Sequence, residues 1–290
     1  MPGRAHNALP DNPCGFFDDE MPYLRIGDVS ARERMLVIPG IGDAFYDGAY
    51  LQEQGWPLRT LVERSYQPYL KDRAVWLVGR SRSMPNGTST ADMAKGYVDH
   101  VLSRLGPVTL RGESMGGMIA THIADAYPEL VDQLVLVATG YRISPYANTA
   151  MEQWEAMARS GAWNELYLDM ARHLYAGWRA GVPKHYDALA SAFGLRHHPR
   201  DAGDFLVSLA ACRAHDTQEA LSKIGAPTLV ICGREDELFT PDIQQVMAQQ
   251  IPNARLCLID NAAHGLYLEK KALFDAEVLA FLDDTRECKR

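Results

Sequence analysis

A short segment near the middle of the chain requires a sharp turn between two kinds of secondary structure. Residues 112–117 have the sequence Gly-Glu-Ser-Met-Gly-Gly. The apolar run 108–110 precedes them and a helical pattern over 118–127 follows, so Ser114 is expected where a buried strand turns into a helix. The glycines two positions before and after this serine stand where a side chain would crowd so tight a turn. A strand followed directly by a helix is typical of α/β proteins.

Short apolar runs recur along the rest of the chain and end at turn residues or polar loops. Such runs are typical of strands that a parallel sheet buries on both faces. Helical patterns separate them, and we predict an α/β fold with a mostly parallel sheet flanked by helices. The expected strands are 35–38, 74–78, 108–110, 134–138, 228–232 and 255–259, with a short edge hairpin at 16–17 and 23–26. The expected helices are 50–69, 89–105, 118–127 and 266–282.

The alternation of strands and helices stops between residues 140 and 219, where only helical patterns remain. We interpret 140–219 as a helical lid inserted over one end of the sheet. Residues 15–139 and 220–290 then form the core domain. Residues 1–14 are polar and contain several prolines, and we expect a flexible lead-in.

Composition excludes several classes of protein. The net charge is −8 and no block of lysines or arginines occurs, which argues against a nucleic-acid surface. No apolar run approaches the 18 or so residues of a membrane span, and the acidic start lacks the features of a signal peptide. Five scattered cysteines indicate reduced thiols rather than a disulfide framework. A cytoplasmic protein is expected, and no pattern indicates an oligomeric state.

The pattern Gly-x-Ser-x-Gly at a strand-to-helix turn is typical of a nucleophilic serine, which makes Ser114 a candidate nucleophile. A serine nucleophile needs a base, and the base needs a carboxylate to orient it. Two later strands end in loops that carry such groups, Asp236 after the strand 228–232 and His264 after the strand 255–259. In a parallel sheet, functional residues collect at the carboxyl ends of the strands. The sequence thus offers Ser114, Asp236 and His264 as a triad, with Glu235 or Glu237 as alternative acids.

These motifs resemble those of the α/β-hydrolase fold family over nearly all of the chain from about residue 35. Ser114 matches the family's nucleophile, Asp236 its acid and His264 its base, in the family's chain order. Residues 233–236 match its Gly-x-x-Asp pattern. The resemblance implies a serine hydrolase that needs no metal, nucleotide or flavin.

The family's early oxyanion turn is matched only in part, because Pro39 stands where histidine is often found. The glycines of residues 39–42 remain. The resemblance implies that the backbone N–H groups of Ile41 and Met115 stabilise the oxyanion, and such donors place no demand on side-chain type.

Several further side chains have two interpretations. Trp154, Trp163 and Trp178 fall in the lid segment, where they either bound a pocket for an apolar group or pack the lid helices together. A substrate carboxylate could bind Arg142, His173, His185 or Arg196. His122 is interpreted as a helix-packing residue and His197–His198 as a loop pair, with no spacing typical of a metal site. Arg111 and Glu113 are charged beside the serine, and the sequence does not name their partners.

Taken with the resemblance, these residues predict a carboxylic ester hydrolase that forms an acyl-enzyme with a small, partly apolar substrate. A carbon–carbon bond hydrolase, a lactonase and an acyltransferase would use the same triad. A ligand-binding protein of this fold with little turnover is the alternative outside catalysis.

Overall fold

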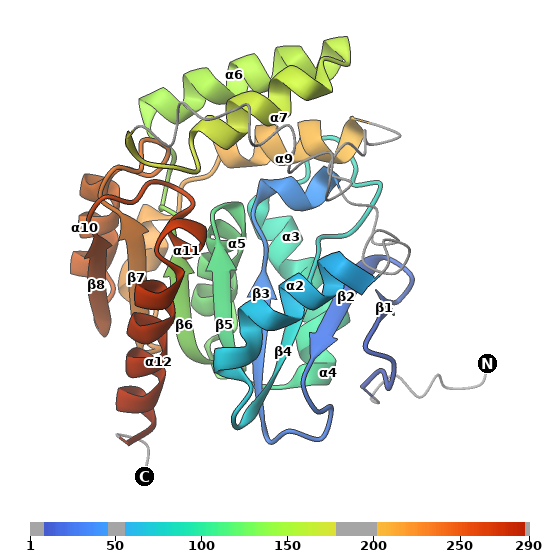
Figure 1. Cartoon of the computed structure of the whole chain (residues 1–290), viewed down its shortest axis with the longest axis vertical. Helices are drawn as coiled ribbons and strands as arrows, with labels where there is room; N and C mark the ends of the chain where they lie inside the picture. The colour runs from blue at the N-terminus through green and yellow to red at the C-terminus, as the bar shows by residue number, and fades with distance from the viewer. Residues whose placement is uncertain (1–8, 46–55, 178–201, 288–290) are drawn as a thin grey trace.

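The computed structural model describes residues 9–45, 56–177 and 202–287. At its centre lies an eight-stranded sheet of order β1-β2-β4-β3-β5-β6-β7-β8 (Figure 1). An antiparallel hairpin, β1 (Cys14–Phe17) and β2 (Met21–Ile26), forms one edge, and β2 is antiparallel to β4. All other pairings are parallel, which confirms the predicted mostly parallel sheet. The remaining strands are β3 (Glu33–Ile38), β4 (Arg73–Val78), β5 (Val108–Glu113), β6 (Val131–Val137), β7 (Thr228–Gly233) and β8 (Ala254–Ile259).

Both faces of the sheet are buried under helices, and alternate residues of each strand point to opposite sides. In β3, Leu36 and Ile38 belong to one core and Met35 and Val37 to the other. Helices α3 (Thr90–Tyr97), α5 (Met115–Ala126) and α10 (Pro241–Gln250) contribute to the first core. The second core includes side chains of α2 (Trp56–Tyr66), η2 (Gln67–Tyr69) and α12 (Lys271–Glu287).

The predicted helices differ in detail from the observed ones. The helix predicted for 89–105 begins as expected, with Ser89 and Asp92 forming a capping box, but it widens into a π-turn, η3 (Val98–Leu102), before α4 (Ser103–Leu105). The helix predicted for 266–282 is divided into α11 (Leu266–Glu269) and α12, with non-helical dihedral angles at Lys270. Within 50–69, helix begins at residue 56 in the part that the structure describes.

In the described part of the chain between β6 and β7, the regular elements are helices. They are α6 (Pro145–Ser160), α7 (Trp163–Arg172), α9 (Gly203–Arg213) and the short η6 (Gln218–Lys223). Figure 1 shows α6, α7 and α9 above the carboxyl ends of the parallel strands. A hydrogen bond of 2.8 Å from Trp154 Nε1 to Asp169 Oδ2 joins α6 to α7. The interpretation of residues 140–219 as a lid stays a proposal.

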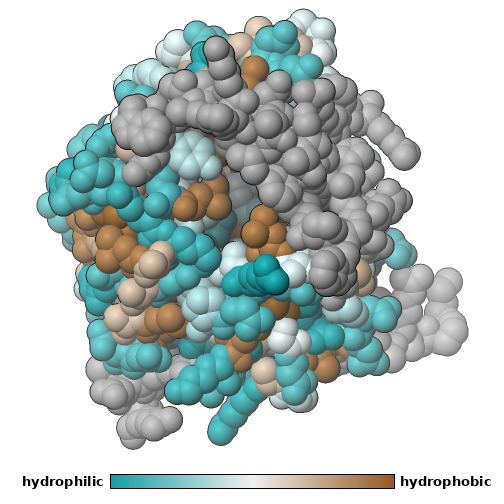
Figure 2. Space-filling model, viewed as in Figure 1, coloured by the Kyte–Doolittle hydropathy of each residue, from teal (hydrophilic) through white to brown (hydrophobic). Residues whose placement is uncertain are grey.

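The visible surface is mainly hydrophilic, with hydrophobic side chains in small groups (Figure 2). Among the described residues, no helix is long and apolar enough to cross a membrane. The described cysteines, Cys14, Cys212, Cys232 and Cys257, are free thiols, and Cys288 lies outside the described residues.

Candidate active site

Ser114 occupies the turn between β5 and α5, as the sequence predicts. Its backbone dihedral angles are φ 53° and ψ −121°, a region that residues other than glycine seldom adopt. The flanking glycines are required by close approach. A Cβ at Gly116 would lie 2.0 Å from the Ile38 carbonyl oxygen, and one at Gly112 would lie 2.5 Å from the Gly116 carbonyl oxygen. The Ser114 N–H donates to the Val137 carbonyl at 2.9 Å, which ties the turn to β6.

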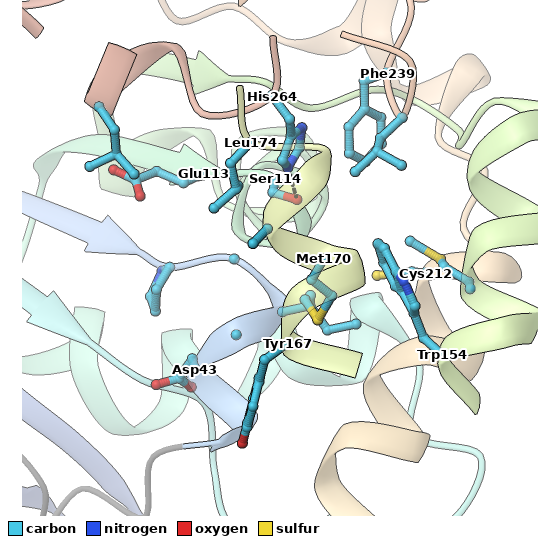
Figure 3. Close-up of a pocket in the computed structure, with 18 of the residues that line it drawn as sticks. Asp43, Glu113, Ser114, Trp154, Tyr167, Met170, Leu174, Cys212, Phe239 and His264 are labelled. Atoms are coloured by element: carbon cyan, nitrogen blue, oxygen red, sulfur yellow. Dashed lines mark hydrogen bonds between the residues drawn. The ribbon is translucent and has the colours of Figure 1, made fainter. Parts of the chain in front are cut away.

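Three loops that follow parallel strands bring the predicted triad residues together. His264 Nε2 lies 3.0 Å from Ser114 Oγ, and His264 Nδ1 lies 2.9 Å from Asp236 Oδ2. The Asp236 side chain is fully buried and that of His264 is 9% exposed. Figure 3 shows the Ser114–His264 hydrogen bond at the wall of a pocket. The arrangement is suited to moving a proton between the serine and the imidazole.

Of the three neighbouring acidic residues, only Asp236 faces the histidine. Its second oxygen, Oδ1, accepts the backbone N–H groups of Leu238 at 2.9 Å and Phe239 at 3.1 Å. Glu235 and Glu237 are exposed. Asp236 is therefore held rigidly, with one oxygen bound to its own loop and the other to the imidazole.

The loop of His264 is bound to the segment that follows α7. The His264 N–H donates to the His173 carbonyl at 3.3 Å, and the Gly265 N–H donates to the Leu174 carbonyl at 2.9 Å. The Glu269 carboxylate joins the same two segments, since it accepts the Ala176 N–H at 3.0 Å and the Ala263 N–H at 2.8 Å. No sequence pattern indicated this role for Glu269.

The two predicted oxyanion donors each begin a helix beside the serine. Ile41 is the first residue of η1 (Ile41–Phe45), and Met115 is the first residue of α5. A backbone N–H at such a position has no acceptor within its own helix. A Cβ at Gly40 would lie 3.2 Å from the Ser114 Cβ, so the loop of Ile41 is in contact with the serine.

A cavity of about 360 Å³ lies over Ser114 and His264, a volume at the small end for small-molecule sites. Figure 3 shows Trp154 of α6, Tyr167 and Met170 of α7, and Leu174 from the turn after α7 at the cavity. The other lining residues include Pro39–Asp43, Glu113, Met151, Ala171, Cys212, Leu238, Phe239, Tyr267 and Leu268.

The three tryptophans predicted to bound the pocket have different positions. Trp154 is buried and lines the cavity. Trp163 is absent from the described lining and stacks edge-on against Phe205, with ring centroids 6.4 Å apart. It matches the alternative interpretation, a packing residue. Trp178 lies outside the described residues.

The acidic residues in the described lining are Asp43 and Glu113, and each of them has a basic partner. Asp43 lies beside Arg80 and Arg82. Burial alone would raise the pKa of Asp43, but these guanidinium groups outweigh it and hold the pKa below its usual value. Glu113 is paired with Arg111.

The polar candidates for a substrate carboxylate do not line this cavity where they are described. Arg142 lies over the Tyr141 ring at 5.3 Å. His173 faces Asp169, with 3.7 Å between Nε2 and Oδ2, and burial lowers the pKa of His173. His185, Arg196 and His197–His198 lie outside the described residues.

Arg111 and Glu113, whose partners the sequence does not name, pair with each other. Arg111 Nη2 lies 2.5 Å from Glu113 Oε1, with side-chain exposures of 4% and 12%. The guanidinium carbon of Arg111 lies 4.8 Å from the Phe274 ring centroid, 5.5 Å from that of Tyr66 and 5.8 Å from that of Tyr69. Glu113 thus provides the counter-charge to a cation enclosed by aromatic rings.

His122 lies on α5 and contacts Thr90 of α3, which agrees with its interpretation as a helix-packing residue. Thr90 Oγ1 lies 3.1 Å from His122 Nε2 and 2.8 Å from His215 Nδ1. Burial, together with the neighbouring His122, lowers the pKa of His215 to about 3. This histidine is therefore neutral in the folded protein at physiological pH.

A mostly parallel sheet with a serine at the strand-to-helix turn after β5 is the arrangement of an α/β hydrolase. A family model described as "Serine aminopeptidase, S33" matches residues 79–271, and the chain belongs to this α/β-hydrolase family.

Individual similar proteins have diverse printed names. A relative from Agrobacterium fabrum with the provisional name carbamate hydrolase RutD is 30% identical over 59% of this chain and 65% of its own length, just under two thirds. A 2-hydroxy-6-oxononadienedioate/2-hydroxy-6-oxononatrienedioate hydrolase from Burkholderia vietnamiensis is 29% identical over 77% of this chain and 78% of its own. The solved structure of MGS-M2, an α/β hydrolase from a Medee basin deep-sea metagenome library, has a TM-score of 0.77 at 19% identity and covers 93% of this chain and 97% of its own.

Proposed function

We propose that the protein is a carboxylic ester hydrolase that works through an acyl-enzyme on Ser114. The observation that carries the proposal is the hydrogen-bonded chain from Ser114 Oγ through His264 to the buried Asp236. In acylation, Oγ attacks the ester carbonyl and its proton passes to His264 Nε2. The C–O bond then breaks, and the alcohol leaves with that proton.

Deacylation repeats the steps with water. His264 takes a proton from the water as it attacks the acyl carbonyl, and returns it to Ser114 when the acid leaves. Asp236 holds the ring tautomer and stabilises the imidazolium. The N–H groups of Ile41 and Met115 donate hydrogen bonds to the oxyanion of each tetrahedral intermediate and stabilise its negative charge.

The lining of the cavity supports a neutral, partly apolar acyl group as substrate. Aliphatic, sulfur-containing and aromatic side chains supply most of it, and its described members include no arginine or lysine. A dioate such as the substrate in the Burkholderia vietnamiensis relative's name would bring two carboxylates to this surface. The helices of residues 140–219 supply Met151, Trp154 and Met170, which supports their interpretation as a lid.

Turnover of short p-nitrophenyl esters together with labelling by an organophosphonate tests the proposal. The wild type is expected to release p-nitrophenol and to carry the label on the peptide containing Ser114. Ser114→Ala should lose both, whereas Ser160→Ala, at an exposed position at the end of α6, should retain both. A label on another peptide, or full activity in Ser114→Ala, contradicts the assignment.

A further inference from the structure

Arg80, two residues after the end of β4, holds the loop that carries a proposed oxyanion donor. Its side chain is 1% exposed. Nη1 donates to the carbonyl oxygens of Pro39 at 3.4 Å and Gly40 at 3.1 Å, and Nη2 donates to that of Ile41 at 3.2 Å. Three consecutive carbonyl groups thus turn toward one guanidinium, whose planar fork offers five donors.

The contact with Gly40 sets the direction of the Ile41 N–H. These two groups belong to one peptide unit, which is planar and trans, so its C=O and N–H point in opposite directions. When Arg80 binds the Gly40 oxygen, the Ile41 N–H must point away from Arg80. Gly40 is also in contact with Ser114, since a Cβ there would lie 3.2 Å from the serine Cβ.

Asp43 fixes Arg80 in turn. Asp43 Oδ2 accepts the Arg80 backbone N–H at 2.9 Å, and the two carboxylate oxygens lie 3.3 and 3.4 Å from the guanidinium nitrogens of Arg82. Gly79 leaves room for this carboxylate, because a Cβ there would lie 2.6 Å from Asp43 Oδ1. The Asp43 N–H also donates to the Gly40 carbonyl at 3.2 Å, which closes the turn at the start of η1.

We propose that Arg80 is a positioning residue that orients the Ile41 N–H toward the oxyanion. The inference rests on the proposed esterase function, and it assigns to Arg80 a role in stabilising the transition state. Arg82 shares the contact with Asp43, but no contact of Arg82 with the carbonyls of residues 39–41 is found in the described structure. The two arginines therefore form a matched pair for an experiment.

The test compares Arg80→Lys and Arg80→Met with Arg82→Lys on one ester and one trifluoromethyl ketone, which forms a tetrahedral adduct with the serine. Loss of one oxyanion donor lowers kcat about 10²- to 10³-fold. For a misdirected donor we expect kcat in Arg80→Lys to fall by about 10- to 100-fold. The affinity for the ketone should fall by a similar factor, while KM changes less than about threefold. Arg82→Lys should stay within about threefold of wild type in all three quantities.

The outcomes separate the inference from the proposed function. A wild type without turnover or phosphonate labelling refutes the function. The inference is overturned if the wild type is active, the Arg80→Lys variant is folded, and the affinity of that variant for the ketone is within threefold of the wild-type affinity. A rise in KM alone overturns it as well, because that result indicates a role in substrate binding. Thermal unfolding identifies folded variants, and Arg80→Lys keeps a cation opposite Asp43, so it is the milder change of the two.

Discussion

Replacing Glu113 with glutamine should destabilise the protein far more than most single substitutions, because it leaves Arg111 as a buried cation without a counter-ion. Two opposite charges about 4 Å apart attract by about 4 kcal/mol at an effective dielectric constant of about 20. Removing one member of a buried pair typically costs about 3–5 kcal/mol. The rings of Phe274, Tyr66 and Tyr69 around Arg111 offset only part of this loss, since such contacts contribute about 0.5–2 kcal/mol. We expect the free energy of unfolding to fall by about 3 kcal/mol.

A second ion pair with the same separation provides the control. Arg255 Nη2 lies 2.5 Å from Glu277 Oε2, but the side chains are 41% and 35% exposed. Exposed pairs contribute about 0–1 kcal/mol, so Glu277→Gln should change the free energy of unfolding by less than about 1 kcal/mol. The comparison keeps both the distance and the substitution and changes the burial; Arg255 also keeps a second acidic neighbour, since its Nη1 lies 3.8 Å from Asp284 Oδ2.

Urea denaturation followed by circular dichroism measures both variants. Adding Arg111→Met to Glu113→Gln should recover part of the lost stability, because the unpaired charge is then absent. If Glu113→Gln costs no more than Glu277→Gln, or if the effects of Arg111→Met and Glu113→Gln add without coupling, the assignment of a buried pair is wrong.

Three shorter predictions concern other residues. Asp236→Asn should lower the rate of acylation by an ester by about 10⁴-fold, whereas Glu235→Gln should retain activity. If ester kinetics gave the opposite result, Glu235 rather than Asp236 would be the acid of the triad. Trp154→Ala should shift the preferred acyl chain toward longer groups and Trp163→Ala should not, and equal profiles for both across a series of esters would contradict this. Because the pKa of His215 is lowered from 6.5 to about 3, the unfolded chain binds a proton between these pH values that the folded chain does not. The folded state therefore keeps its full stability above pH 6.5 and loses stability as the pH falls toward 3. At pH 5 this loss is about 2 kcal/mol by urea denaturation, and His215→Gln should remove it; an unchanged pH dependence would refute the cause.

The sequence predicts the parts of this molecule that local patterns control. Runs such as 228–232 can be buried on both faces only in a central strand, and Gly112 and Gly116 have no alternative at so tight a turn. The proximity of Ser114, Asp236 and His264 could be predicted because each follows a parallel strand, and the carboxyl ends of these strands share one edge of the sheet.

Contacts between distant segments explain what the sequence alone could not predict. Arg80 acts on carbonyls about forty positions earlier, and Glu269 binds the N–H of Ala176, 93 positions away. Backbone carbonyls and N–H groups carry no signal in the sequence. Trp154 and Trp163 both lie in helical patterns, and only the packing of α6, α7 and α9 decides which of them meets the cavity.

The bonds between the His264 loop and the segment after α7 have a consequence for access to the serine. A movement of α7 that opened the cavity on this side would strain the backbone bonds from His264 and Gly265 and the two bonds of Glu269. The imidazole would then be drawn away from Ser114, and the hydroxyl would lose its base at the moment when bulk water had the freest access. The serine would therefore be reactive only while the cavity is closed on this side, and opening it would remove the base from the hydroxyl.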